Sequence, residues 1–286
     1  MNTLQATNAT TVTTVNTTIS HVWNLLTAPS HIQNWVSPSP EFNVNTVVNH
    51  FAVGGTFNVP FTPVNHSTPF GFEFSGTYTN IVPFKSFTYN LANGYTLSYE
   101  FNVLGESVEI IQSINVNNLP VNETVIGYYN NLLNNFKTYL SSFSTFLNTS
   151  TFSVSSPISH VWNVFTTPTH VMNWVIPTNE FTSTPVIENF VVGANFHFPI
   201  VSENGTPFEF DFKGTFTNII PGSFLAYTLE NGTTLFVSFV VNGENVELTY
   251  SVDFGSNPTS EFHLNYFNTI MTNFKSYVLG TLTYNN

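Results

Sequence analysis

Four histidines recur at matching places in the two halves of the chain and are the first candidates for chemistry. His21 and His31 in the first half correspond to His160 and His170 in the second. Local metal sites on helices usually place two ligands four positions apart on one face. His21 and His31 are instead separated by a break that contains Pro29. We therefore expect histidines that lie on helix surfaces or cap helix ends, and we expect no metal site.

Two carboxylates and one more histidine are candidates for acid–base chemistry or for orienting a ligand. Glu73 and Asp211 occupy matching places in strand-like segments, where burial in a cleft raises the pKa of a carboxyl group. Both alternate with phenylalanines, so a solvent-exposed outer face is the simpler interpretation. His263 replaces Val125 on the apolar stripe of the last predicted helix. It either faces a cavity there or is a half-exposed histidine with hydrogen-bond partners.

The sequence lacks the common catalytic signatures. It contains no nucleophile elbow, phosphate loop or dinucleotide fingerprint, and Gly54-Gly55 is too short to cradle a phosphate. The absence of cysteine excludes thiolate nucleophiles, disulfides and sulfur ligands for metals. We expect no cofactor. Tryptophans can stack on a ligand, although packing of helix against sheet is the simpler role for Trp23, Trp35, Trp162 and Trp174.

The charge usage restricts the possible partners. Only 7% of the 286 residues are charged, and sixteen acidic residues against four lysines give a formal net charge of -12. Nucleic acids and anionic membrane surfaces are therefore not expected partners, because both are bound through Lys and Arg. Neutral Asn and Thr residues occupy the remaining polar positions. This pattern favours self-assembly or an acidic or external setting, or it reflects a compositional bias without functional meaning.

The sequence leaves the compartment open. No apolar run reaches the roughly 18 residues that a membrane span needs, so no membrane insertion is expected. The N-terminal residues show no signal peptide, which favours the cytoplasm, whereas the low charge suits an extracellular or acidic setting. Seven glycosylation sequons make a glycoprotein possible, but a chain this rich in Asn, Ser and Thr contains such sequons by chance.

The chain consists of two copies of one domain. Ile19–Asn24 returns as Ile158–Asn163, and Asn135–Tyr139 returns with one substitution as Asn273–Tyr277. A repeat this long is a duplicated domain rather than a solenoid unit. The predicted domains are residues 1–145 and 146–286.

Each copy reads as strand, two short helices, antiparallel strands and a long helix. In the first copy, Thr11–Val15 is strand-like, and apolar residues from Ile19 to Leu26 recur at helical spacing. Phenylalanines and tyrosines then alternate with polar residues, and Asn93-Gly94 is a hairpin turn. Residues 125–140 form a long amphipathic helix. The sheet must curl around this helix, which leaves a cleft between the two.

Four motifs accompany this order of elements: Val22-Trp23 through Thr27, Pro29, His31-Ile32 and Trp35, together with Gly54-Gly55, Phe74-x-Gly76-x-Tyr78 and Asn135-Phe136-Lys137-x-Tyr139. The second copy repeats them, except that Gly193-Ala194 replaces the glycine pair. The order with these motifs resembles the START-like (SRPBCC) superfamily, and within it the domain homologous to the C-terminal half of the activator of heat-shock-protein-90 ATPase.

The resemblance implies an α+β helix-grip fold in each copy and a ligand-sized cavity, as in many members, without a shared catalytic set. A few members bind a chaperone. The chaperone activator carries a separate N-terminal domain and charged contact surfaces that this sequence does not show, so we do not expect chaperone binding or ATPase activation.

Three functional hypotheses follow. The first is a non-enzymatic protein that binds a small hydrophobic ligand in an apolar pocket of each domain. The second is a structural subunit that assembles into a filament or lattice through its neutral surface and strand edges. The third is a cyclase- or hydrolase-like enzyme, for which we find no polar cluster. The candidate pocket residues are Phe72, Phe74, Tyr99, Phe101, Tyr129 and Leu133 in the first copy, and Phe210, Phe212, Phe239, His263, Phe267 and Met271 in the second.

Overall fold

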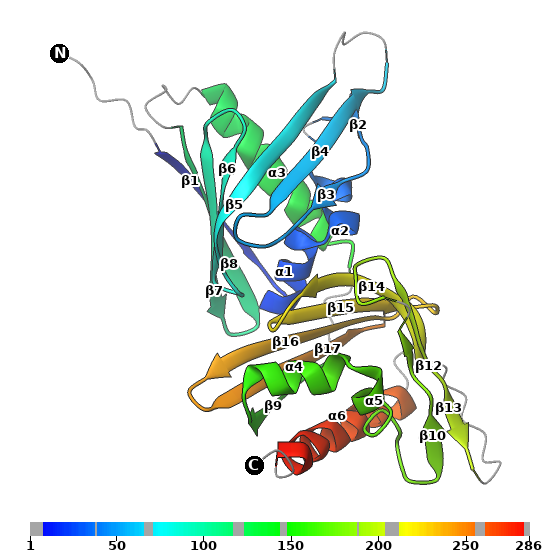
Figure 1. Cartoon of the computed structure of the whole chain (residues 1–286). Helices are drawn as coiled ribbons and strands as arrows, with labels where there is room; N and C mark the ends of the chain where they lie inside the picture. Colours follow the sequence, from blue (N-terminus) through cyan, green and yellow to red (C-terminus); the bar gives the residue numbers. More distant parts are fainter. Residues whose placement is uncertain are drawn as a thin grey trace. The chain divides into compact units, whose positions relative to one another are not determined.

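The computed structural model of the chain divides into two compact units, Met1–Thr145 and Phe146–Asn286. We refer to these units as the first and second domains. The structure describes residues 8–37, 39–65, 71–116, 123–143, 148–187, 189–203, 212–254 and 261–282. In each domain the chain forms a strand, two short helices, a series of antiparallel strands and a long helix, in that order (Figure 1).

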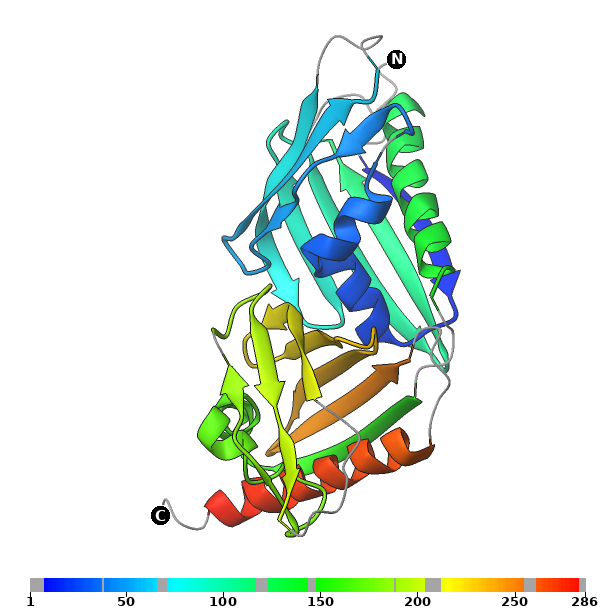
Figure 2. The ribbon, with the colours of Figure 1, turned by 90° about the vertical axis from the view of Figure 1, so that its right-hand side faces the viewer.

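The first domain is built on an antiparallel sheet whose strand order is β1-β8-β7-β6-β5-β4-β2, with β3 also paired to β4. Figure 2 shows its three helices on one face of this sheet. The helices are α1 (Ile19–Thr27), α2 (Pro29–Trp35) and α3 (Glu123–Leu140). The strands are β1 (Asn8–Val15), β2 (Phe42–Val44), β3 (Val48–Asn49), β4 (Thr56–Pro63), β5 (Phe72–Val82), β6 (Ser86–Leu91), β7 (Thr96–Leu104) and β8 (Ser107–Asn115).

The second domain repeats this design. Its main sheet has the order β11-β12-β14-β15-β16-β17-β9, and β10 and β13 form a separate pair. The helices are α4 (Ile158–Thr166), α5 (Pro168–Val171) and α6 (Glu261–Leu282). The strands are β9 (Asn148–Ser155), β10 (Phe181–Ser183), β11 (Val186–Ile187), β12 (Asn195–Phe198), β13 (Ile200–Ser202), β14 (Phe212–Ile220), β15 (Phe224–Leu229), β16 (Thr234–Asn242) and β17 (Asn245–Asp253).

Alternating side chains and glycine turns explain the strands. Along β8, buried residues alternate strictly with partly exposed ones, so that Val108, Ile110 and Gln112 face the helices. The predicted hairpin turns place Gly94 at φ 89° and Gly232 at φ 86°, in the left-handed region that glycine adopts without strain. Strong local turn signals therefore set the register of the strands that form the cavity wall.

The Asn-Phe-Lys-x-Tyr motif fastens each long helix to the second short helix. In the first domain, the Asn135 amide donates to the carbonyl of Ser37 at 2.8 Å, and the Tyr139 hydroxyl lies 3.0 Å from Nδ1 of His31. The second domain has the same contacts, from Asn273 to the carbonyl of Ile176 at 2.8 Å and from Tyr277 to His170 at 3.1 Å. The phenylalanines of the motif, Phe136 and Phe274, are fully buried.

The predicted fold class is confirmed: the chain has two tandem α+β domains, each an antiparallel sheet packed against a long C-terminal helix. Each domain has a core of aromatic and aliphatic side chains between the sheet and the helices. In the ranges that the structure covers, no helix is long and apolar enough to cross a membrane.

Candidate functional site

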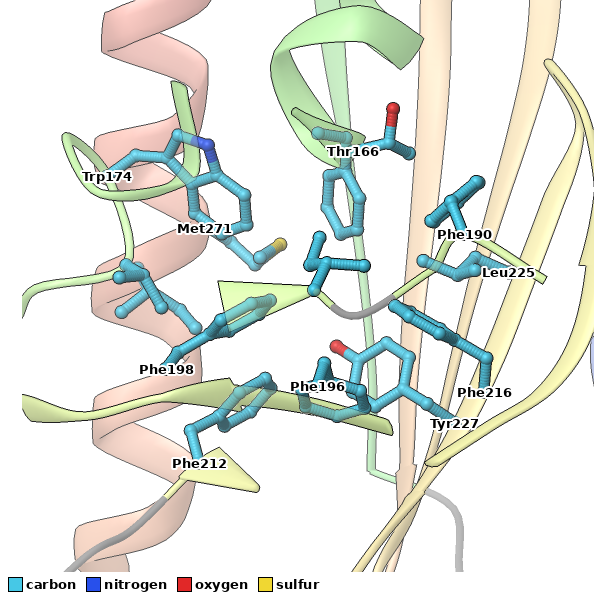
Figure 3. A pocket seen from close by; sticks show the side chains of 14 residues that line it. Thr166, Trp174, Phe190, Phe196, Phe198, Phe212, Phe216, Leu225, Tyr227 and Met271 are labelled. Atoms are coloured by element: carbon cyan, nitrogen blue, oxygen red, sulfur yellow. The ribbon is translucent and has the colours of Figure 1, made fainter. Parts of the chain in front are cut away.

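Each domain encloses an apolar cavity between its sheet and its helices. In the second domain, aromatic and aliphatic side chains from β12, β14, β15, α4 and α6 surround the cavity together with Trp174, which follows α5 (Figure 3). The lining residues are Phe165, Thr166, Trp174, Val175, Ile187, Phe190, Phe196, Phe198, Phe212, Phe216, Leu225, Tyr227, Ile270 and Met271. None of these residues carries a charge, so the cavity suits an uncharged, apolar molecule.

The first domain holds its cavity at the equivalent place. Its lining residues are Leu26, Ile32, Trp35, Val36, Val47, Phe57, Val59, Phe74, Tyr78, Phe87, Tyr89 and Tyr99. Trp35 is held in the wall because its indole N–H donates to the carbonyl of Leu25 at 3.0 Å. Trp174 makes the same bond in the second domain, to the carbonyl of Val164 at 3.1 Å. Each tryptophan thus closes the cavity between the sheet and the short helices.

Both cavities are narrow. The space between the lining side chains is about 420 Å³ in each domain, including the part open to solvent. The volume that the centre of a water molecule can occupy is only about 40 Å³ in the first domain and about 20 Å³ in the second. One water needs roughly 10–15 Å³ on this measure. A ligand of many atoms therefore fits only if lining side chains move outward.

Tyrosine hydroxyls are the main polar groups at the cavity walls. Burial raises the pKa of Tyr99 to about 12 and raises the pKa values of Tyr78, Tyr89 and Tyr227 further. All four phenols therefore stay neutral and protonated near pH 7. They can donate or accept hydrogen bonds, and they bring no net charge to the cavity.

In the first domain the cavity hydroxyls have partners within the protein. The Tyr78 hydroxyl donates to the Asn49 side chain at 2.9 Å. The Tyr99 hydroxyl accepts from the amide of Gln112 at 2.8 Å and also interacts with the Tyr89 hydroxyl. These bonds hold the polar side of the first cavity in a fixed arrangement.

Four of the candidate pocket residues line these cavities. Phe74 and Tyr99 lie at the wall in the first domain, and Phe212 and Met271 do so in the second. They come from the strands and the long helix, as the alternation of apolar and polar residues had indicated. That these four residues contact a bound ligand stays a prediction.

Other candidate residues are buried away from the cavities. Phe101 and Phe239 pack beneath the first tryptophan of each repeat, with ring centroids 5.7 Å from Trp23 and 5.3 Å from Trp162. The remaining three, Tyr129, Leu133 and Phe267, are buried on the long helices but do not line the cavities. They form part of the layer behind the cavity wall.

Phe72 does not line the cavity of the first domain. Its side chain is 40% exposed and stacks on Phe61 with a centroid distance of 4.6 Å. The carboxylate of Glu73 is on the exposed part of the same strand. Phe210 and Asp211, like the side chain of His263, lie outside the described residues.

The histidine prediction is wrong for His21, which is not on a helix surface. It is 1% exposed, and its ring lies 3.0 Å from the Thr17 hydroxyl and packs edge-on against Phe143. Burial, with a smaller contribution from the neighbouring His31, lowers its pKa to about 4. Burial also lowers the pKa of His31 to about 4. Among the residues that the structure describes, no group of three or more His, Asp or Glu side chains could hold a metal.

Most residues of the cavity walls are not among the candidates predicted from the sequence. β6 and β15 contribute Phe87 and Tyr89 in the first domain, and Leu225 and Tyr227 in the second. Their alternation is visible in the sequence, but both segments are only six residues long. The tryptophans Trp35 and Trp174, interpreted as packing residues, both pack and line the cavities.

Comparison with protein families gives one match in each half of the chain. The family described as activator of Hsp90 ATPase homolog 1-like protein matches residues 16–141 and 155–278. Comparison with curated proteins gives no match.

Solved structures similar to the chain fall into two sets. Chr148 from Cytophaga hutchinsonii is 27% identical, with 47% of this chain and 92% of that chain covered and a TM-score of 0.41. The AHSA1-like protein from Aeromonas hydrophila is 19% identical, with 47% and 93% covered and a TM-score of 0.41. The di-domain ARO/CYC protein StfQ from the steffimycin biosynthetic pathway is 11% identical, with 96% and 99% covered and a TM-score of 0.36.

Proposed function

The chain belongs to the family of activator of Hsp90 ATPase homolog 1-like proteins, with one family domain in each half, and from this premise we propose that it is a non-enzymatic binding protein for small hydrophobic molecules. The observation that supports the proposal is the uncharged aromatic cavity at the same place in both domains. Apolar enclosure with a few polar groups is typical of small-molecule sites.

Because the cavities are narrow, a ligand can enter only after lining side chains have moved. Removing apolar surface from water stabilises a complex by about 25 cal/mol per Å², but the lining side chains must first move apart. In the second domain, Met271 on α6 is the most flexible of the lining residues, because its side chain is unbranched. In the first domain, Phe74 is only partly buried at the cavity's edge. These two side chains are the candidates for the movement.

The two domains supply a matched pair of variants for testing the proposal. Val59 lines the first cavity, and the repeat places Phe198 at the same position in the second. We expect Val59→Phe to fill the first cavity and Phe198→Val to enlarge the second. The fluorescent probe N-phenyl-1-naphthylamine should therefore bind about tenfold more weakly to the first domain of Val59→Phe, and more tightly to the second domain of Phe198→Val.

Titration of the full chain with the probe, with the two sites resolved by calorimetry, measures both effects. The exposed Val12→Ala variant serves as the control, because Val12 lies on the outer strand β1 and lines neither cavity. Probe binding that responds to neither cavity variant, or native mass spectra in which no small molecule remains bound at saturating probe, would contradict the proposal.

Self-assembly is a second candidate function, which two edge strands support. β1 and β9 each end a sheet, each has eight residues, and neither contains a charged residue. An uncharged strand edge can pair with the edge of another copy, and lysine is a common guard against such pairing. We therefore expect the chain to form species larger than a monomer as its concentration rises.

Light scattering over a concentration series tests this expectation. The Val12→Lys variant adds a charge to an exposed position of β1 and should shift the population toward monomer. The Val53→Lys variant adds the same charge at an exposed position outside the strands and should leave the assembly unchanged. A wild-type chain that stays monomeric at every concentration would end this hypothesis.

A further inference from the structure

In the second domain, the Tyr250 hydroxyl is buried without a hydrogen-bond partner among the described residues, and Tyr227 at the cavity wall lies close to it. Tyr227 on β15 is 6% exposed and Tyr250 on β17 is 3% exposed. The Tyr250 hydroxyl makes no hydrogen bond within the described residues. A buried polar group without a partner destabilises the folded state, because it has lost its hydrogen bonds to water. Such a group in a packed core needs an explanation.

The two hydroxyls lie at the cavity and close to each other. Figure 3 shows the oxygen of Tyr227 pointing in among the other lining side chains. Tyr250 is near enough for an electrostatic interaction with Tyr227. Phe267 packs against both Phe212 of the cavity wall, with a centroid distance of 6.2 Å, and Tyr250, at 5.4 Å. Tyr250 therefore lies next to the cavity wall, beside the lining residue Tyr227.

The first domain shows what can connect such groups. There, Tyr89 takes the place of Tyr227, Gln112 takes the place of Tyr250, and Tyr99 stands directly across from Gln112 on the neighbouring strand. The Tyr99 oxygen bonds to Gln112 at 2.8 Å and interacts with Tyr89. One oxygen atom between the two flanking residues joins them.

The second domain lacks that connecting oxygen. Val237 takes the place of Tyr99 and stands directly across from Tyr250. Valine is shorter than tyrosine and has no polar atom, so its side chain cannot bond the hydroxyls of Tyr227 and Tyr250 as Tyr99 bonds its neighbours. In the first domain the Tyr99 oxygen lies between the two flanking side chains. At the equivalent place in the second domain, an oxygen atom of a ligand would accept hydrogen bonds from both Tyr227 and Tyr250.

We propose that the second domain binds an apolar molecule that carries one neutral carbonyl oxygen, and that this oxygen accepts hydrogen bonds from the hydroxyls of Tyr227 and Tyr250. A carbonyl oxygen has two acceptor positions, which match two O–H donors. None of the residues that line the cavity is charged, so a neutral group fits and a carboxylate does not. The inference rests on the proposed function and names its ligand class.

A pair of probes of the same shape separates the carbonyl from the rest of the molecule. 1-Indanone and indane differ by one carbonyl group. We expect 1-indanone to bind the full-length chain more tightly than indane does, by calorimetry. Tyr227→Phe and Tyr250→Phe should each weaken 1-indanone binding about tenfold, because each variant removes one hydrogen bond to the carbonyl. A tenfold change in Kd corresponds to about 1.4 kcal/mol, which is in the range of one hydrogen bond. Neither variant should weaken indane binding.

Infrared spectroscopy reports on the carbonyl directly. The carbonyl stretching band of bound 1-indanone should lie at lower frequency in the wild type than in either variant, because hydrogen bonds weaken the C=O bond. Val12→Ala changes an exposed residue that lines neither cavity and should leave this band unchanged. Val237→Tyr installs the connecting hydroxyl of the first domain and should remove the preference for the ketone.

The outcomes separate this inference from the proposed function. If neither probe binds, both the proposed function and the inference fail. If indane binds but the phenylalanine variants weaken both probes equally, or leave the carbonyl band in place, only the inference is overturned. A bound water that bridges Tyr227 and Tyr250 in the presence of saturating 1-indanone would overturn it as well.

Discussion

Lowering the pH from about 6.5 to about 4 destabilises the first domain by several kcal/mol. Burial lowers the pKa of His21 and of His31 to about 4, whereas a histidine in the unfolded chain accepts its proton near pH 6.5. Between these pH values the unfolded chain binds more protons than the folded domain, so the free energy of unfolding falls as the pH falls. The contribution is fully present above pH 6.5 and is lost toward pH 4.

The expected loss is on the order of 3 kcal/mol for each histidine, since one pKa unit corresponds to about 1.4 kcal/mol. Two histidines together reach about 6 kcal/mol, which is comparable to the whole stability of a domain. Urea unfolding at a series of pH values, with hydrogen exchange and mass spectrometry assigning each transition to its domain, measures this slope.

A pair of matched variants identifies the histidine contribution. His31→Gln removes one titrating group and keeps a side chain that can bond the Tyr139 hydroxyl, so it should reduce the slope of the first domain by about half. His170→Gln makes the same change beside Tyr277 in the second domain and should leave that slope unchanged. An unchanged slope in His31→Gln would assign the pH dependence to the carboxylates instead.

Replacement of Phe274 by alanine lowers the stability of the second domain by about 3–5 kcal/mol. Phe274 on α6 is fully buried, and its ring contacts Trp174 and Phe165 at centroid distances of 5.1 and 5.2 Å. Alanine removes the ring and leaves a void that these neighbours cannot close, because Trp174 is also fixed by its bond to the Val164 carbonyl. Urea unfolding of the full chain gives the change.

Thr272→Ala is the control for the helix, because Thr272 is exposed on the same helix two residues earlier. Its substitution should change stability by no more than about 0.5 kcal/mol. Phe136→Ala removes the matching ring in the first domain, which contacts Trp35 at 5.4 Å, and should act on that domain only. A loss below about 1 kcal/mol for Phe274→Ala would show that the aromatic cluster can collapse around the missing ring.

The repeats and the strand pattern were sufficient to predict the fold. The two copies of a duplicated domain share one architecture. Each motif that occurs in both copies therefore supports the same fold assignment twice. The glycine of the Phe-x-Gly-x-Tyr motif illustrates the physical basis: a Cβ at Gly214 would lie 2.3 Å from the carbonyl oxygen of Thr228. Only glycine allows β14 and β15 to approach this closely. A glycine inside this strand motif therefore indicates, from the sequence alone, where a neighbouring strand packs.

The cavity walls were harder to predict, since they depend on where the short helices sit over the sheet. Phe72 and Phe74 lie on one face of β5, yet only Phe74 lines the cavity. Phe72 pairs with Phe61 toward the end of the strand and remains 40% exposed. Periodicity identifies the inward face of a strand but not the part of that face that the helices cover. His21 was missed for a related reason, because Phe143, which packs against it, follows the distant helix α3.

The narrowness of the cavities bears on residence time. With room for only one to a few water molecules between the rings, passage in either direction depends on how often the walls part. Exchange is then governed by opening motions of the protein rather than by diffusion. A molecule once enclosed would stay through dilution and transport, and would leave at a rate that rises steeply with temperature. Such a protein is suited to retention and slow release rather than to rapid sensing.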